Sequence, residues 1–215
     1  MFDYSRYDYM IFDCDGVILD SNRLKSRAYA NALPGEPTKL VHAFVDYHKK
    51  NGGISRYEKF HYYFNEMKNS PNAEKETHVA LGRFSTIVKK CLLECNYVPG
   101  VLEFIHQVNS LGIPIFVVSG SDEKELIDIF RQRGILDLFE RVYGSPVNKN
   151  DNTAKVLKRV GLQKKGSFFG DSKSDYAAAS KYALDFVFVS GLSEWCEGSQ
   201  YSENIILNFN VEEKI

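Results

Sequence analysis

The stretch Met10-Ile11-Phe12-Asp13-Cys14-Asp15-Gly16-Val17 places two carboxylates and a glycine directly after a short apolar run. Such a run is typical of a buried strand in a parallel sheet. In open α/β sheets, ligands bind beyond the carboxyl ends of the strands, so this strand is expected to deliver Asp13 and Asp15 to a site. Two carboxylates this close repel each other unless a cation or a shared proton intervenes. Because hard oxygen ligands suit Mg²⁺, the stretch predicts a magnesium site.

An alternative for the same stretch is an Asx turn at the surface after a strand. A calcium loop of the EF-hand type is excluded, because its glycine stands two positions later. If the stretch is catalytic, a metal-bound carboxylate can act as a nucleophile while its neighbour serves first as acid and then as base. The rest of the chain decides between these interpretations.

Length and composition limit the class of protein. The chain has 215 residues, 44% of them hydrophobic, and a net charge of -1, which suffices for a core domain with a small appended one. The charge balance argues against nucleic acid as a partner, and no apolar run approaches the roughly 20 residues of a membrane span. No signal peptide is expected at the N-terminus. Four cysteines without CxxC spacing predict a reduced, cytoplasmic protein.

The order of the predicted elements divides the chain into two parts. Strand signals are nearly absent from about residue 21 to residue 96, where helices are expected over 22–33, 39–50, 55–68 and 72–94. Ser55 is expected to cap the third of these helices, with Glu58 completing a capping box. We therefore predict a core domain formed by residues 1–20 and 97–215 and an all-helical cap domain formed by residues 21–96.

From Val98 onward, short apolar strands alternate with helices, which implies a parallel sheet with right-handed crossovers. The fold class is therefore α/β. The expected strands after the first are 114–118, 141–143, 167–169 and 186–189, and residues 204–209 are a candidate edge strand.

Two of these strands lead into residues suited to phosphate chemistry. Ser119 and Gly120 follow the strand 114–118, where a hydroxyl and free backbone N–H groups can meet an anion at a helix N-terminus. A helix cap formed by Ser121 or Asp122 is the alternative. After the strand 141–143, a lysine can hold both a phosphoryl oxygen and a carboxylate. Lys149 fits best in this role, and Lys155 is the alternative.

The strand 167–169 leads into Gly170-Asp171-Ser172-Lys173-Ser174-Asp175. Asp171 stands at the end of the strand, where it can complete a metal shell, and Asp175 lies one turn into the next helix. Taken alone, this stretch is also compatible with a turn and a helix cap.

Taken in order, these stretches resemble the four motifs of the haloacid dehalogenase (HAD) superfamily. The first motif is matched by Asp13-Cys14-Asp15-Gly16-Val17, the second by Ser119, the third by Lys149 and the fourth by 170–175. The third match is the weakest, because many relatives have a proline where this chain has Asn150. The resemblance spans roughly Tyr9 to Val189 and is to the phosphoglycolate phosphatase and β-phosphoglucomutase-like branch with a helical cap.

This resemblance implies a Rossmann-like parallel sheet of strand order 3-2-1-4-5 with the cap inserted after the first motif. It also implies a Mg²⁺-dependent phosphatase in which Asp13 forms an aspartyl-phosphate and Asp15 acts as acid and base. Ser119 and Lys149 would be catalytic and would bind phosphate together with Gly120. The implied metal ligands are Asp13, Asp171 and the carbonyl oxygen of Asp15, with Asp175 behind them.

The cap is expected to select the substrate. Gly52-Gly53-Ile54-Ser55-Arg56 resembles the cap loop of β-phosphoglucomutases, so Arg56 and Lys59 are candidates for contacting a hydroxyl-rich or anionic leaving group. A solvated cationic helix start is the alternative. Lys25 stands where those mutases have a histidine, which favours hydrolysis, although a Schiff-base role as in phosphonate-cleaving relatives stays open for it.

We therefore expect a phosphatase for a small phosphate ester such as a sugar phosphate, acting as a monomer or homodimer without nucleic-acid or membrane partners. Asp15 favours a phosphate over a haloacid substrate, because dehalogenating relatives lack this acid. A sugar phosphomutase is the second candidate, and a non-catalytic binding protein on the same fold is the third.

Overall fold

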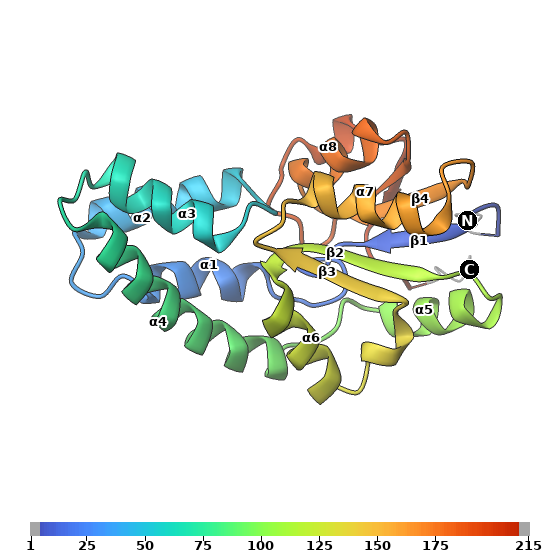
Figure 1. The fold of residues 1–215 in the computed structure, drawn as a ribbon, viewed down its shortest axis with the longest axis horizontal. Helices are drawn as coiled ribbons and strands as arrows, with labels where there is room; N and C mark the ends of the chain where they lie inside the picture. Colours follow the sequence, from blue (N-terminus) through green and yellow to red (C-terminus); the bar gives the residue numbers. More distant parts are fainter. Residues whose placement is uncertain (1–4, 211–215) are drawn as a thin grey trace.

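A computed structural model describes residues 5–210, and its centre is a six-stranded parallel sheet (Figure 1). The strands run in the order β3-β2-β1-β4-β5-β6. Their bounds are Tyr9–Phe12 for β1, Ile115–Asp122 for β2, Arg141–Ser145 for β3, Gly166–Gly170 for β4, Asp185–Val189 for β5 and Asn204–Ile206 for β6. The predicted fold class and the order of the first five strands are confirmed, and the candidate strand near the C-terminus pairs in parallel with β5.

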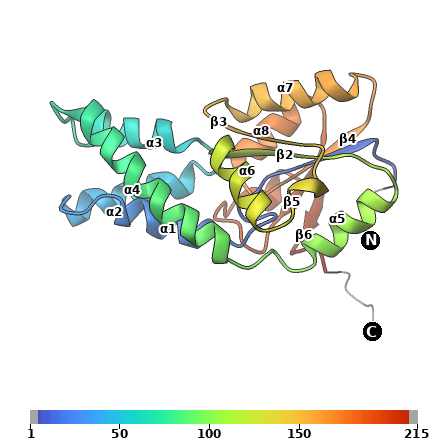
Figure 2. The ribbon, with the colours of Figure 1, turned by 60° about the horizontal axis from the view of Figure 1, so that its bottom comes forward.

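Helices cover both faces of the sheet (Figures 1 and 2). On one face lie α5 and α6 and on the other α7 and α8, with bounds Val101–Ser110, Glu123–Gln132, Lys149–Val160 and Lys173–Lys181. The side chains of β1 alternate between the two hydrophobic clusters: Met10 and Phe12 belong to one, Tyr9 and Ile11 to the other. Because both faces of β1 are buried, the strand is apolar throughout.

The segment between β1 and α5 is helical and lies at one end of the sheet (Figure 1). Its helices are α1 (Asn22–Asn31), α2 (Thr38–Lys50), α3 (Arg56–Tyr62), a π-helical turn (Tyr63–Met67) and α4 (Ala73–Glu94). They pack around buried rings, among them Tyr29, Phe44, Phe60 and Phe84, with ring centroids 4.3 to 5.6 Å apart. The single helix expected over 55–68 is thus interrupted by the π turn, where Tyr63 and Phe64 are both buried.

Two connecting segments join the helical cap to the sheet, and they run side by side. The N–H of Asp20 donates to the carbonyl of Asn96 over 2.9 Å, and that of Val98 donates to Ile18 over 3.0 Å. The chain therefore leaves and re-enters the core at one place, just beyond β1, which holds the cap beside the carboxyl edge of the sheet. The exact domain boundaries after residues 20 and 96 stay a prediction. Within residues 5–210, no helix combines the length and the apolar character needed to cross a bilayer.

Candidate active site

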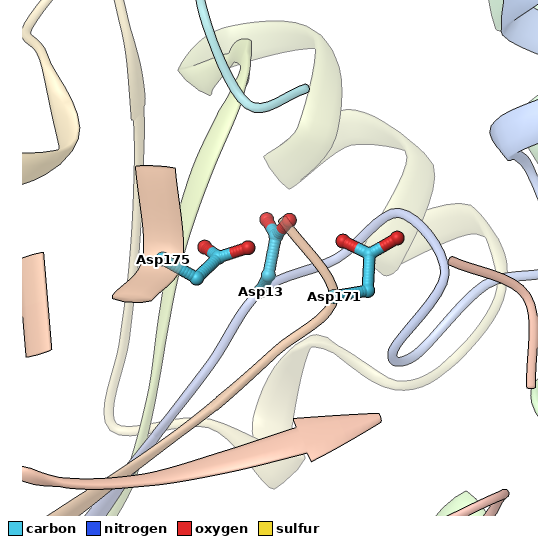
Figure 3. Close-up of side chains that lie close together, drawn as sticks. All are labelled: Asp13, Asp171 and Asp175. Atoms are coloured by element: carbon cyan, nitrogen blue, oxygen red, sulfur yellow. The ribbon is translucent and has the colours of Figure 1, made fainter. Parts of the chain in front are cut away.

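Three carboxylates meet at the carboxyl edge of the sheet. Asp13 follows β1, Asp171 follows β4 and Asp175 lies in the first turn of α8, and one oxygen of each lies within 4.8 Å of the other two. Figure 3 shows Asp13 between the other two side chains. Burial, followed by the nearby carboxylates, raises the pKa of Asp13 to about 7 and that of Asp171 well above its usual range. The cluster therefore attracts positive charge.

Lys149 supplies part of this positive charge. Its Nζ lies 3.0 Å from Oδ2 of Asp13 and donates a hydrogen bond to Oδ1 of Asp175. Burial opposes the charged form of the lysine, but attraction to the two carboxylates raises the pKa of Lys149, so it stays a cation. Lys149 is the first residue of α7 rather than a loop residue. Lys155 lies further along the same helix and donates to Asn152 instead, so the structure brings only Lys149 of the two candidates to Asp13.

The carboxylate cluster has the donor set of a divalent-cation site. Oδ1 of Asp13 is buried without a hydrogen-bond partner among the described residues. Asp171 accepts a hydrogen bond at Oδ2 from Asn22 over 2.6 Å, and no described residue donates to its Oδ1. Both oxygens of Asp175, in contrast, accept hydrogen bonds, from Lys149 and from Ser172. The residues thus fit a cation held by Asp13 and Asp171, with Asp175 fixing Lys149 beside them.

The carboxylate of Asp15 has a different set of hydrogen-bond partners. Its carboxylate accepts hydrogen bonds from Ser21 at 2.5 Å, Lys25 at 2.5 Å and Ser121 at 2.9 Å. Burial works against ionisation of Asp15, but the ion pair with Lys25 and the hydroxyl donors lower its pKa. Lys25, for which the sequence left several roles open, is therefore the direct partner of the expected acid and base. The role of the Asp15 carbonyl as a metal ligand stays a prediction.

The second motif lies inside β2, which continues to Asp122 instead of ending at Val118. The pairing with β3 is irregular between these two residues, which opens the strand locally. Ser119 is fully buried, and its Oγ accepts a hydrogen bond from the N–H of Ser121 over 3.2 Å. Gly120 and Ser121 line the cavity, whereas Ser119 is not among its lining residues. Asp122, one of the two candidate caps, accepts a hydrogen bond from the first turn of α6.

The loop between α2 and α3 closes directly onto the core. Gly53 has φ +75°, and a Cβ there would lie 1.9 Å from Oγ of Ser174 and 3.0 Å from Nζ of Lys149. A Cβ on Gly120 would lie 2.2 Å from the carbonyl oxygen of Gly53. Glycine is therefore required at both positions for this approach of the cap backbone to Gly120 and Lys149.

A cavity separates the rest of the cap from the carboxylates. Its cap wall includes Tyr29, His48, Arg56 and Lys59, and its core wall includes Asp13, Asp15 and Asp171. The segment after β5 adds Glu194 and Trp195, which carry no motif signal in the sequence. Glu194 accepts hydrogen bonds from Ser26 of α1, so this segment is tied to the cap.

The two cap residues expected to contact substrate have different partners. Arg56 donates two hydrogen bonds to Glu125 of α6, over 3.0 and 2.6 Å, and its guanidinium lies over the ring of Phe84. Lys59 is only 2% exposed, and its Nζ lies 2.8 Å from Nδ1 of His48. Both side chains line the cavity, and their contact with a substrate stays a prediction.

The parallel sheet, the carboxylates beyond β1 and β4 and the inserted helices together define the HAD class of α/β enzymes. The sequence profile of the haloacid dehalogenase-like hydrolases matches residues 10–189, and the chain belongs to this family. The family membership predicted from the four motifs is therefore confirmed. No curated protein sequence matches the chain.

Several solved structures share the fold over nearly the whole chain. A protein described as a predicted phosphoglycolate phosphatase from Haemophilus somnus 129PT has a TM-score of 0.76 at 18% identity, with 96% of each chain covered. CbbY from Rhodobacter sphaeroides, as a mutant bound to xylulose-(1,5)-bisphosphate, has a TM-score of 0.73 at 16% identity, with 94% and 95% covered. β-Phosphoglucomutase from Clostridium difficile has a TM-score of 0.70 at 18% identity, with 95% and 92% covered. At these identities the likeness establishes the fold.

Proposed function

We propose that this hydrolase is a Mg²⁺-dependent phosphatase that cleaves a small phosphate monoester through an aspartyl-phosphate on Asp13. The main observation that supports this proposal is the position of the Asp13 carboxylate. One of its oxygens is paired with Lys149, while the other is buried without a partner beside Asp171. A carboxylate fixed in this way, with positive charge around it, suits attack on phosphorus.

In the first step, an oxygen of Asp13 bonds to phosphorus and the ester P–O bond breaks. Asp15 protonates the leaving oxygen and then takes a proton from the water that hydrolyses the aspartyl-phosphate. Lys25 donates to Asp15 over 2.5 Å and so lies where a proton can reach that carboxylate. Lys149 and the backbone N–H groups around Gly120 offset charge on the phosphoryl oxygens. Mg²⁺, held by Asp13 and Asp171, adds charge neutralisation at the phosphoryl group when bound.

The structural relatives support a small phosphorylated metabolite as substrate, because their names refer to phosphoglycolate, phosphoglucose and a sugar bisphosphate. We place the reaction in the cytoplasm, in keeping with four free cysteines. A sugar phosphomutase is the second candidate. The contact of Gly53 with Gly120 and Lys149 favours it, since a closed cap loop shields a phospho-enzyme from water.

Phosphate release from a panel of esters, with Mg²⁺ and then with EDTA, tests the proposal. The panel includes β-glucose 1-phosphate, so that a mutase is recognised by formation of the 6-phosphate without release of phosphate. Release that is lost in EDTA supports the phosphatase. If neither release nor isomerisation is observed for any ester, the proposal is wrong and a non-catalytic binding role is indicated.

A further inference from the structure

Lys59 is a buried cation on the cap side of the cavity that has no carboxylate partner. Its side chain is among the most buried of the chain, with 2% of the residue exposed. Of the other cap cations that line the cavity, Lys25 and Arg56 are paired with Asp15 and Glu125, and Lys49 and Lys50 are exposed to solvent. Within residues 5–210, no acidic side chain lies within ion-pair distance of Lys59, whose neighbour is the imidazole of His48. An unpaired charge in such a place destabilises the protein unless a ligand supplies its partner.

His48 presents a second unpartnered polar atom at the same place. It is 8% exposed, and burial followed by the charge of Lys59 lowers its pKa well below the usual range, so the ring is neutral. Nζ of Lys59 lies 2.8 Å from Nδ1, and because a charged lysine can only donate, Nδ1 accepts from it and the ring proton then lies on Nε2. Nε2 is buried without a hydrogen-bond partner among the described residues. The Nε2–H of His48 therefore lacks an acceptor and the ammonium of Lys59 lacks a counter-ion, and the two side chains are neighbours in the wall of the cavity.

Lys59 lies in the cap wall of the cavity, on the side where the leaving group of a substrate would lie. Burial and then the nearby Lys25 lower the pKa of Lys59 to about 7, whereas Asp15 and Glu194 act in the opposite direction. Asp15 is the residue that would protonate the leaving oxygen, so the part of a substrate beyond that oxygen extends toward the cap. Glu194 lines the same cavity and would repel an anion, which favours a place for the acidic group away from Glu194, at the wall formed by Lys59 and His48.

We propose that Lys59 and His48 hold a second acidic group of the substrate, a carboxylate or a phosphate, so that the substrate is the phosphate monoester of an acidic alcohol. This inference rests on the proposed phosphatase function. A carboxylate or phosphate oxygen accepts hydrogen bonds from both the ammonium and the imidazole N–H and neutralises the buried charge. Arg56 is not needed for this contact, because both of its Nη groups already donate to Glu125.

The test compares esters that differ in the second acidic group. Phosphoglycolate is paired with hydroxyethyl phosphate, and glucose 1,6-bisphosphate is paired with glucose 1-phosphate, so that the two pairs distinguish a carboxylate from a phosphate. In the wild-type protein, kcat/KM for the acidic member of at least one pair is expected to exceed that of its neutral member about tenfold or more. In Lys59→Met this ratio falls toward one. Lys90→Met removes an exposed lysine of α4 and keeps the wild-type ratio.

A ratio near one for both pairs in the wild type, or a ratio that Lys59→Met leaves unchanged, would overturn the inference. His48→Gln provides an independent variant, expected to reduce the same ratio. A binding measurement separates this inference from the proposed activity: in EDTA, the favoured acidic ester should raise Tm of the wild type but not of Lys59→Met. If no ester is hydrolysed, the phosphatase proposal fails, and the Tm shifts still decide whether the anion site exists.

Discussion

Arg56 of α3 and Glu125 of α6 form a buried, two-bond ion pair that joins the helical cap to the core domain. The two side chains are 4% and 9% exposed, and Ser85 of α4 donates a further hydrogen bond to Glu125 over 2.6 Å. Next to this pair, Tyr57 donates to Asp122 at the start of α6. The substrate contact of Arg56 suggested by the sequence stays a prediction, and the interactions that the structure shows for Arg56 join the cap to the core.

Breaking the Arg56–Glu125 pair is expected to destabilise the protein. Arg56→Met leaves Glu125 buried without its main partner and should lower the free energy of unfolding by about 3 kcal/mol, measured by denaturant titration. The double variant with Glu125→Leu should be less destabilised than either single variant. Lys89→Met, which removes the exposed ion pair with Asp128 at the same interface, serves as a control without measurable loss.

The same variants test how Arg56 affects activity. If Arg56 acts by holding the cap closed, Glu125→Gln and Arg56→Met should raise KM by similar factors. A rise in KM that occurs only in Arg56→Met would instead mean that Arg56 binds the substrate directly.

Replacement of Asp13 by asparagine should abolish turnover and leave the fold intact. The amide is a poor nucleophile, so kcat is expected to fall by about a thousandfold or more. The fold should persist because the change removes one of three crowded carboxylates. Circular dichroism and phosphate release measure the two effects, and a variant with wild-type rates would refute Asp13 as the nucleophile.

Mg²⁺ should stabilise the protein in a manner that depends on pH. The pKa of Asp13 is raised to about 7 and that of Asp171 is raised as well, so protons compete with the metal for the same oxygens. The increase in Tm caused by Mg²⁺ should therefore grow as the pH rises to about 7. Asp171→Asn should abolish this increase. A Tm shift that is independent of pH, or that survives in Asp171→Asn, would place the metal elsewhere.

Lys59 should make the protein less stable at acidic than at alkaline pH. Burial lowers the pKa of Lys59 from 10.5 to about 7, so between these values the unfolded chain binds a proton that the folded chain does not. Stability therefore rises with pH across this window, and the cost of the buried charge is fully present below pH 7. Lys59→Met should gain up to roughly 4 kcal/mol there, with the gain shrinking as the pH rises. Equal unfolding curves for both proteins at all pH values would contradict this assignment.

Gly53→Ala should impair activity more than its effect on stability explains. Gly35, also in the cap, has a similar φ of +83° against +75°, but a Cβ there would meet nothing within 4 Å. The positive φ should cost about 1 kcal/mol of stability in both variants, and the collision with Ser174 adds to this cost in Gly53→Ala. Only Gly53→Ala should lower kcat/KM, since its methyl group would collide with Ser174 and move the loop away from Lys149. Equal kinetic losses in both variants would rule out a role for this loop contact.

The parts of the site that could be predicted from the sequence lie where a strand ends. Asp13 and Asp171 each follow an apolar run directly, so a local pattern and the geometry of parallel sheets suffice to bring them together. Lys149 was harder to place, because its position depends on where α7 begins. The candidate strand over 204–209 was shorter than expected because only Asn204–Ile206 pair with β5.

The pairings around the cavity could not be predicted in this way. Arg56 and Glu125 are 69 positions apart, and the sequence contains no pattern that selects this acid among the many on the surface. Glu194 comes from a segment without regular structure, which gives no periodic signal. The pairing of Lys25 with Asp15 depends on how α1 is oriented against the core. Each of these contacts is decided by tertiary packing.

The paired segments Ile18–Asp20 and Asn96–Val98 have a consequence for the timing of the reaction. Lys25 belongs to α1, which follows the first of these segments, whereas Asp15 precedes that segment and Ser121 lies in β2. A swing of the cap about the paired segments would therefore draw the ammonium of Lys25 away from the Asp15 carboxylate. The same movement would then admit a substrate and remove Lys25, the partner that lowers the pKa of Asp15. Opening and closing of the cap would thereby set the protonation state of Asp15.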